Sequence, residues 1–262
     1  MHVSTASVAS AFAAQGFVHL PGCFAGPRLL ELQRVAERFH AAWCDAHADL
    51  LVAGAVNSAG LTGSRFLGEG DRRVLFEFLA QDAVRAVLGQ VFASSPAFMN
   101  TQLFFNPRDP GQHNYWHRDV QYTGMSLADQ QQALSRLQVV HLRVALRPEP
   151  GMEFVPGTHQ RWDTPDEFAV RMEQRGRQRW EALSGAVQVP LREGDMLAFS
   201  ANMLHRGLYG LDRLAFDMLF CDPLPELLAY VPQDCLPQAS MLESLPCAQM
   251  FELAGARRGA IE

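Results

Sequence analysis

Residues 115–122 read Tyr-Trp-His-Arg-Asp-Val-Gln-Tyr, and another histidine follows in the run Asn-Met-Leu-His-Arg-Gly at 202–207. These two runs supply His117, Asp119 and His205 as candidate metal ligands. Two imidazoles and one carboxylate form the facial triad of a mononuclear non-haem Fe(II) centre, which leaves coordination positions open for other ligands. The triplet alone would also fit a His and an Asp at a loop edge without a metal.

A second His-x-Asp pair, His47-Ala48-Asp49, is expected within a helix. Apolar residues recur there at helical spacing over 29–51, so side chains two residues apart point to different sides. His117 and Asp119 instead follow an apolar run at 98–105 and a turn-rich stretch at 106–111. That order predicts strand, loop, strand, and residues i and i+2 of a strand share a face. We therefore predict that both side chains reach one ion from a strand.

Short apolar segments separated by turn signals fill the second half of the chain. They predict strands at 98–105, 116–121, 137–146, 153–155, 186–189, 195–200 and 214–221. Such a set favours two facing antiparallel sheets. In the first half, apolar spacing predicts a strand at 17–20 and helices over 4–15, 29–51 and 82–92. The expected fold is mainly β with α: a double-stranded β-helix, or cupin-like jelly roll, with a flanking N-terminal helical layer.

The organisation along the chain indicates one domain. Neither an internal repeat nor a Pro/Ser-rich linker interrupts residues 1–262. We expect a helical layer over about 1–95, the jelly-roll core over about 96–222 and a C-terminal tail over 223–262, to which the sequence assigns no chemistry. A Trp-rich polar insert at 161–183 is expected to form a helical excursion over the mouth of the barrel.

Composition narrows the class of partner. The net charge of −6 argues against nucleic acid or an anionic membrane as the main partner, because phosphate binding needs a basic face. All 22 cationic side chains are arginine, which excludes Schiff-base and P-loop lysine chemistry. A small-molecule substrate is the expected partner, and the sequence does not indicate an oligomeric state.

The five cysteines form no close Cys-x-x-Cys pair, and their odd number favours reduced thiols. Residues 1–15 contain neither a basic region nor a long apolar core, and no apolar run is long enough to span a bilayer. We therefore expect a cytoplasmic protein without a signal peptide or membrane span.

Several motifs occur together in one order, namely Trp-His-Arg-Asp at 116–119, the strand 140–146, Phe-Val-Pro-Gly-Thr-His at 154–159, Gly-Asp-Met-Leu-Ala-Phe at 194–199, then His205 and Arg213. This order resembles the phytanoyl-CoA dioxygenase family over roughly residues 16–222. The resemblance implies a double-stranded β-helix that uses Fe(II), 2-oxoglutarate and O2. It also implies His117, Asp119 and His205 as the metal ligands.

The same resemblance implies an arginine after the distal histidine as the anchor of 2-oxoglutarate, which here is Arg213. A planar guanidinium can pair with a carboxylate through two hydrogen bonds. The spacing of eight residues from His205 is shorter than the family commonly shows, and Gly207 replaces the usual small hydroxyl residue. Arg206 is the competitor, although it should face away from the metal. Gln102 is a second candidate contact to 2-oxoglutarate.

Other polar and aromatic residues have both functional and structural interpretations. Arg143 lies within an apolar strand, so it either meets a carboxylate or binds an anionic substrate in a wet cavity. Trp116 and Tyr122 flank the metal motif as candidate substrate contacts, but aromatic residues there often pack the barrel. His141 and His113 are expected to be satisfied polar residues, and His159 is expected to be structural.

The expected reaction is hydroxylation of an unactivated C–H bond, with release of succinate and CO2. The carboxylate of Asp119 favours hydroxylation because related halogenases carry Ala or Gly at that position. A small organic acid, an amino-acid derivative or a secondary-metabolite intermediate is the expected substrate. Three alternatives remain open: an acyl-CoA hydroxylase, a non-catalytic jelly-roll binding protein and a cupin-type enzyme without 2-oxoglutarate.

Overall fold

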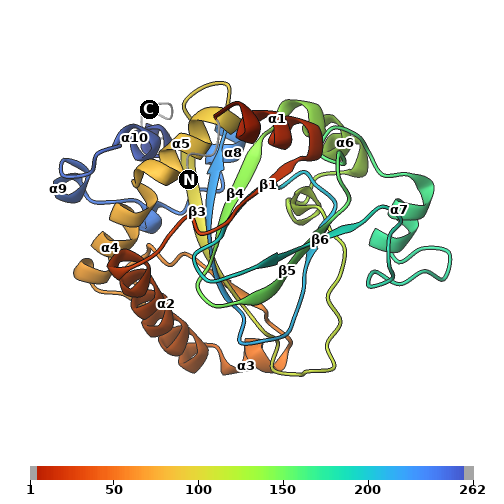
Figure 1. Cartoon of the computed structure of the whole chain (residues 1–262), viewed down its shortest axis with the longest axis horizontal. Helices are drawn as coiled ribbons and strands as arrows, with labels where there is room; N and C mark the ends of the chain where they lie inside the picture. Colours follow the sequence, from red (N-terminus) through yellow and green to blue (C-terminus); the bar gives the residue numbers. More distant parts are fainter. Residues whose placement is uncertain (1–4, 257–262) are drawn as a thin grey trace.

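The computed structural model describes residues 5–256, and its strands form two antiparallel sheets (Figure 1). The larger sheet has the order β1-β7-β4-β9-β3-β2 and the smaller has the order β6-β5-β8. The strands are β1 Phe17–Leu20, β2 Asn57–Ala59, β3 Ala97–Phe105, β4 Val139–Ala145, β5 Glu149–Phe154, β6 Val187–Leu191, β7 Met196–Ser200, β8 His205–Gly207 and β9 Leu214–Cys221. The predicted jelly-roll class is confirmed.

The two sheets pack face to face through an apolar cluster. Phe17 and Phe199 of the larger sheet meet Phe154 of the smaller one, and the rings of Phe17 and Phe154 stack with centroids 4.7 Å apart. Aromatic pairs in such offset arrangements add to the stabilisation gained from burial. This cluster fixes the separation of the sheets on one side of the space that they enclose.

Strand β9 shows how the larger sheet divides its two faces. All eight residues from Leu214 to Cys221 are buried. Phe216, Met218 and Phe220 belong to the main apolar core with the helices, whereas Asp217 between them bonds to polar residues of β4. Successive side chains of a strand point to opposite faces. The outer face is therefore apolar, and the inner face carries buried polar groups toward the smaller sheet.

Helices cover the outer face of the larger sheet. Figure 1 shows α2, α4 and α5 on one side of β3 and β4, with β5 and β6 on the other. The helices are α1 Thr5–Gln15, α2 Pro27–Ala46, α3 Ala48–Val52, α4 Glu69–Leu79, α5 Asp82–Val91, α6 Leu127–Arg136, α7 Pro165–Arg171, α8 Pro225–Leu228, α9 Ala239–Leu242 and α10 Gln249–Gly255, with 3₁₀ turns η1 Asp119–Tyr122 and η2 Gln233–Cys235. Within residues 5–256, none of the helices is long and apolar enough to cross a bilayer.

Three sequence-based expectations about these elements need correction. The helix predicted over 29–51 is interrupted at His47, and the insert 161–183 contains only the short helix α7. The segment 116–121 is not a strand, because it forms one isolated β-bridge at His117 and then turns into η1. Residue 4, at the start of the first predicted helix, lies outside the described residues.

The turn before β7 packs closely against the segment that follows β1. Gly194 has φ of 79°, and a Cβ atom on it would lie 2.1 Å from the carbonyl oxygen of Phe24. Only glycine fits such a close approach in this backbone conformation. The carboxylate of the next residue, Asp195, accepts hydrogen bonds from the backbone N–H of Gly22 and Arg192 and contacts Nε2 of His19 at 2.9 Å.

Candidate metal centre and its pocket

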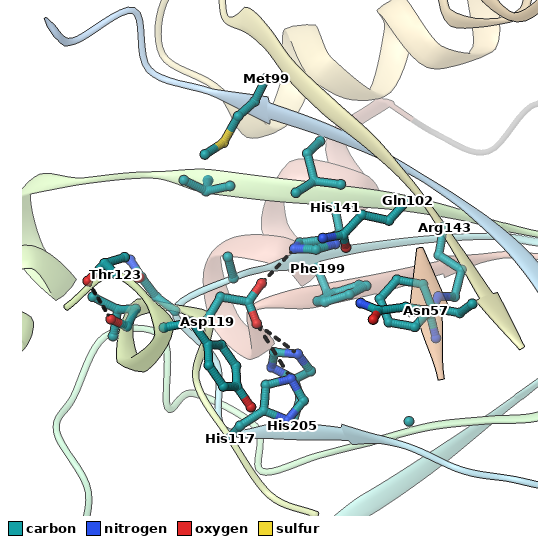
Figure 2. Close-up of a pocket in the computed structure, with 18 of the residues that line it drawn as sticks. Asn57, Met99, Gln102, His117, Asp119, Thr123, His141, Arg143, Phe199 and His205 are labelled. Carbon is teal, nitrogen blue, oxygen red and sulfur yellow. Dashed lines mark hydrogen bonds and ion pairs between the residues drawn. The ribbon is translucent and has the colours of Figure 1, made fainter. Parts of the chain in front are cut away.

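Three of the predicted side chains converge in the pocket between the sheets (Figure 2). Oδ1 of Asp119 lies 3.5 Å from Nε2 of His117 and 3.5 Å from Nε2 of His205. Their potential ligand atoms all lie within 4.8 Å of one another. Among residues 5–256, this is the group of His, Cys, Asp and Glu side chains that could hold a metal ion.

A pair of backbone hydrogen bonds brings the two histidines together. The N–H of His117 donates to the carbonyl of His205, and the N–H of His205 donates back, both at 3.0 Å. Residues that exchange both bonds lie directly opposite each other in an antiparallel pair, and here the imidazole centroids are 4.2 Å apart. Asp119 then joins them from the first position of η1. The convergence arises from this bridge and turn, not from the predicted i, i+2 strand geometry.

The second nitrogen of each imidazole is already occupied. Nδ1 of His117 lies 3.1 Å from the carbonyl oxygen of Tyr115, and Nδ1 of His205 lies 2.9 Å from that of Met203. Such contacts place the proton on Nδ1 and leave the Nε2 lone pair for a metal. Burial lowers the pKa of both imidazoles, that of His205 to about 3. Both are therefore held in the neutral form that a metal requires.

The carboxylate of Asp119 is oriented by His141 of β4. Oδ2 of Asp119 lies 2.8 Å from Nε2 of His141, whose Nδ1 lies 3.1 Å from Oδ2 of Asp217. Burial alone would lower the pKa of His141, but its bonds to the two carboxylates raise it to about 9. A protonated imidazole donates to both partners. His141 therefore occupies one oxygen of Asp119 and leaves Oδ1 facing the two histidines.

The polar chain continues from Asp217 to Arg143. Nε of Arg143 donates to Oδ1 of Asp217 at 2.7 Å, and Nη2 donates to Oδ2 at 3.1 Å. The sequence left open whether Arg143 meets a carboxylate or binds an anionic substrate. Its charge is in fact paired with Asp217 through two hydrogen bonds, and its side chain is buried.

Arg213 and Arg206 lie in different surroundings. Arg213 is buried in the pocket lining, where Nε donates to Oε2 of Glu149 at 3.0 Å and Nη1 contacts the carbonyl of Phe105 at 3.4 Å. Arg206 lies outside this lining, pairs with Glu153 and donates to the carbonyl oxygen of Trp180. The structure thus places Arg213 next to the enclosed space and directs Arg206 away from it.

The triad opens into a cavity of about 530 Å³. Gln102 of β3 lies in its wall, and Tyr122 lies at its mouth with 60% of its surface exposed. Trp116 does not line the cavity. It is fully buried between Val155 and Leu204, so the expectation that it contacts substrate is corrected.

Residues 12–208 match the family model described as Phytanoyl-CoA dioxygenase (PhyH). This chain belongs to the phytanoyl-CoA dioxygenase family. The sequence-based family prediction is therefore confirmed, and with it the class of non-haem oxygenase that uses Fe(II), 2-oxoglutarate and O2. No protein among the curated sequences compared matches this chain.

Solved structures share the fold of this family member. AviO1 from Streptomyces viridochromogenes Tue57 is 17% identical, with a TM-score of 0.59 over 85% of this chain and 97% of AviO1. SnoN, described as a non-heme alpha ketoglutarate dependent epimerase from nogalamycin biosynthesis, is 20% identical, with a TM-score of 0.55 over 84% and 83%. EctD from S. alaskensis is 16% identical, with a TM-score of 0.60 over 85% and 79%.

The structure places Gly207 against Arg213, the two residues at which the sequence departs from the pattern expected of the family. A Cβ atom on Gly207 would lie 2.6 Å from Nη2 of Arg213. The guanidinium therefore fills the space that a small hydroxyl side chain would need at residue 207. The glycine at residue 207 and the arginine at residue 213 therefore fit together in this part of the pocket wall.

Arg118, the central residue of the His-Arg-Asp motif, was not singled out from the sequence. It is fully buried, donates to Oδ1 of Asp163 and to the carbonyl oxygens of Thr158 and Arg161, and is hydrogen-bonded to the carbonyl of Asn202. A buried guanidinium needs such compensation. Arg118 thus holds the segment with His117 and Asp119 against residues 158–163 and against Asn202. The sequence feature that could have indicated this role is a charged residue between two predicted metal ligands.

The C-terminal tail also contributes to the site. Leu227 and Tyr230 line the cavity, and the Tyr230 hydroxyl lies 3.4 Å from the carbonyl oxygen of Thr123, which follows η1. No pattern in the sequence predicts that these residues lie beside the metal motif. The sequence assigned no chemistry to residues 223–262, whereas the structure places two of these residues in the cavity wall.

Proposed function

We propose that this protein is a hydroxylase that holds Fe(II) through His117, Asp119 and His205 and binds 2-oxoglutarate at Arg213. The strongest support is that the remaining nitrogen or oxygen atom of each triad side chain already has a partner within the protein. Both Nδ1 atoms meet backbone carbonyls and Oδ2 of Asp119 meets His141, so two Nε2 atoms and one Oδ1 remain for a metal. Two neutral imidazoles and one carboxylate suit Fe(II) and leave it open positions.

The surroundings of Arg213 fit a dicarboxylate. Its Nη2 makes no hydrogen bond to any residue from 5 to 256, although the side chain is almost completely buried in the pocket wall. A buried guanidinium with an available edge is suited to a carboxylate. Gln102 lies in the same wall and can provide an amide hydrogen bond. We assign the distal carboxylate of 2-oxoglutarate to Arg213 and a supporting contact to Gln102.

The residues of this chain define what the site can do. Bound iron and 2-oxoglutarate supply the oxidising power for attack on a C–H bond, with succinate and CO2 as co-products. The triad would hold the metal, His141 fixes the carboxylate, and apolar walls limit water around the reacting groups. With iron bound, the carboxylate of Asp119 would take up a coordination position, which favours hydroxylation over halogenation.

The metal assignment is tested by binding of Mn(II), a redox-stable substitute for Fe(II), measured by calorimetry without oxygen. We expect one site in the wild type and at least a hundredfold weaker binding in Asp119→Ala. Asp49→Ala is the matched control, because it alters the other His-x-Asp pair and should bind Mn(II) normally. Normal binding in Asp119→Ala would contradict the assignment.

The reaction type needs a separate experiment, because related structures include proteins described as an epimerase and a carbocyclase. Candidate substrates are first screened by succinate release, and each product is then formed under ¹⁸O2 and analysed by mass spectrometry. Hydroxylation incorporates one labelled oxygen atom. A product without the label would contradict the proposed hydroxylation. It would indicate an enzyme that oxidises or rearranges its substrate without transferring oxygen to it.

A further inference from the structure

The cavity has a polar end and an apolar end, and the register of the larger sheet sets them apart. Arg143 of β4 lies opposite Asp217 of β9. Val139 lies opposite Cys221, and this second pair is four residues away from the first on each strand. Figure 2 shows Met99 on the other side of His141 from Arg143 and Gln102. Asp119 and His141 lie between the two ends. The candidate metal centre therefore borders both.

We call the apolar end the apolar arm. Its walls come from β3, β4 and β9, from η1 and α6 with the adjoining loops, and from the C-terminal tail. Its residues are Met99, Val120, Thr123, Met125, Ala133, Leu137, Val139, Asn202, Leu219, Leu227 and Tyr230. None of them carries a charge. A ligand in the apolar arm would therefore lose water without meeting an ion of opposite charge.

Each polar side chain of the apolar arm already makes at least one contact within the protein. The Thr123 hydroxyl donates to the carbonyl of Val120 at 2.7 Å, and Nδ2 of Asn202 donates to that of Leu137 at 2.8 Å. The Tyr230 hydroxyl is 3.4 Å from the carbonyl of Thr123. Groups that are satisfied within the protein do not require a polar ligand. The apolar arm thus favours hydrocarbon or ring surface.

The cations at the polar end are also committed. Asp217 neutralises Arg143 through two hydrogen bonds, and Glu149 accepts one hydrogen bond from Nε of Arg213 while lying 4.0 Å from Arg143, which leaves the Nη2 edge of Arg213 for one carboxylate. If 2-oxoglutarate takes the free edge of Arg213, no arginine of the cavity remains for a second anion. Burying an uncompensated carboxylate or phosphate is strongly unfavourable.

We propose that the apolar arm binds the primary substrate and that this substrate is uncharged and largely apolar where it lies inside the cavity. This inference rests on the proposed function, because it reserves Arg213 for 2-oxoglutarate. It disfavours a small organic acid, and also an acyl-CoA whose phosphates enter the cavity. A cavity of about 530 Å³ lies within the range that accommodates ligands of drug size.

Two probes of matched shape test the charge preference: 2-naphthalenemethanol, which is neutral, and 2-naphthoate, which is an anion. Each is titrated by calorimetry into anaerobic protein loaded with Mn(II) and 2-oxoglutarate. We expect the alcohol to bind at least tenfold more tightly than the carboxylate. Equal binding, preference for the carboxylate, or binding of neither probe would overturn the proposal.

Met99→Arg adds a test that misfolding cannot mimic, because it should reverse the preference toward 2-naphthoate. Leu50→Arg is the matched control, since Leu50 is exposed on α3 and is not among the lining residues. It should retain the preference for the alcohol, whereas Met99→Arg with an unchanged preference would count against the apolar arm. Binding of 2-oxoglutarate is measured first in each variant, so its loss reports on the proposed function separately.

Discussion

The two oxygens of the Asp119 carboxylate have different neighbours, and this difference defines the candidate metal site at the scale of single residues. Oδ1 faces the Nε2 atoms of both histidines, and Oδ2 is held by His141. His141 is held in turn by Asp217. A carboxylate fixed in this way presents one oxygen to a metal without first having to adopt the right rotamer.

Removing His141 should therefore weaken metal binding although it is not a ligand. We expect His141→Ala to lower Mn(II) affinity by about 10- to 100-fold, because partners that orient ligands commonly have effects of that size. His141→Gln retains a donor and should recover part of the loss. His113→Ala is the control, because His113 stacks on Trp180 instead. Wild-type affinity in His141→Ala, measured by calorimetry, would refute this positioning role.

Gly207 gives a second prediction at the residue scale. In Gly207→Ser the new Cβ would lie 2.6 Å from Nη2 of Arg213 and force the guanidinium to move. We expect about tenfold or greater loss of 2-oxoglutarate affinity with unchanged Mn(II) affinity, since a small misplacement of a binding group can have large effects. Gly89→Ser, where a Cβ meets no atom within 4 Å, should behave as wild type. A Gly207→Ser variant with normal 2-oxoglutarate binding would show that Arg213 is not the anchor.

At the scale of elements, Asp195 connects β1 to the turn before β7. Its pKa is lowered: burial acts in the opposite direction, but hydrogen bonds from the backbone of Arg192 and Gly22 and from His19 favour the charged form. Asp195→Asn should reduce the free energy of unfolding by about 2 kcal/mol at pH 7, as expected for hydrogen bonds to a charged group. Urea denaturation measures this loss, with Asp49→Asn as an exposed control.

The effect of Asp195 should depend on pH in a defined direction. Because the folded pKa is depressed, the stabilisation is complete above the unfolded carboxyl pKa of about 3.9 and disappears as the pH falls through the folded value. The difference in stability between wild type and Asp195→Asn should thus stay constant from pH 7 to about pH 5 and narrow below pH 4. A difference that widens on acidification would contradict this assignment.

At the scale of the whole molecule, local patterns predict some features and not others. The apolar run of β9 and the helical spacing of α2 are local, so the sheet and the helical layer could be recognised from sequence. The partner of Asp119 could not, because His141 reaches it from β4 whereas Asp119 lies in η1, 22 residues earlier in the chain. The same holds for Tyr230, which the tail brings to the cavity from outside the core.

The segment 116–121 shows why a correct ligand set can come from an incorrect local structure. The i, i+2 spacing selects the right pair of residues, but the backbone forms only one bridge to His205 before η1 begins, and this bridge and turn bring His117 and Asp119 together. Buried Arg118 anchors this loop to residues 158–163, a contact that periodicity does not reveal. The residue types were enough to predict the metal ligands. The backbone conformation depends on contacts between residues that are distant in sequence.

The central claim is that the triad binds iron and Arg213 binds 2-oxoglutarate in the same cavity. Anaerobic titration with Fe(II) and 2-oxoglutarate tests it directly, through the weak visible charge-transfer band of the chelated complex. We expect the band in wild type and in the control Arg206→Ala, with marked weakening in Arg213→Ala. Absence of the band from folded, iron-loaded wild-type protein, or an undiminished band in Arg213→Ala, would contradict the account.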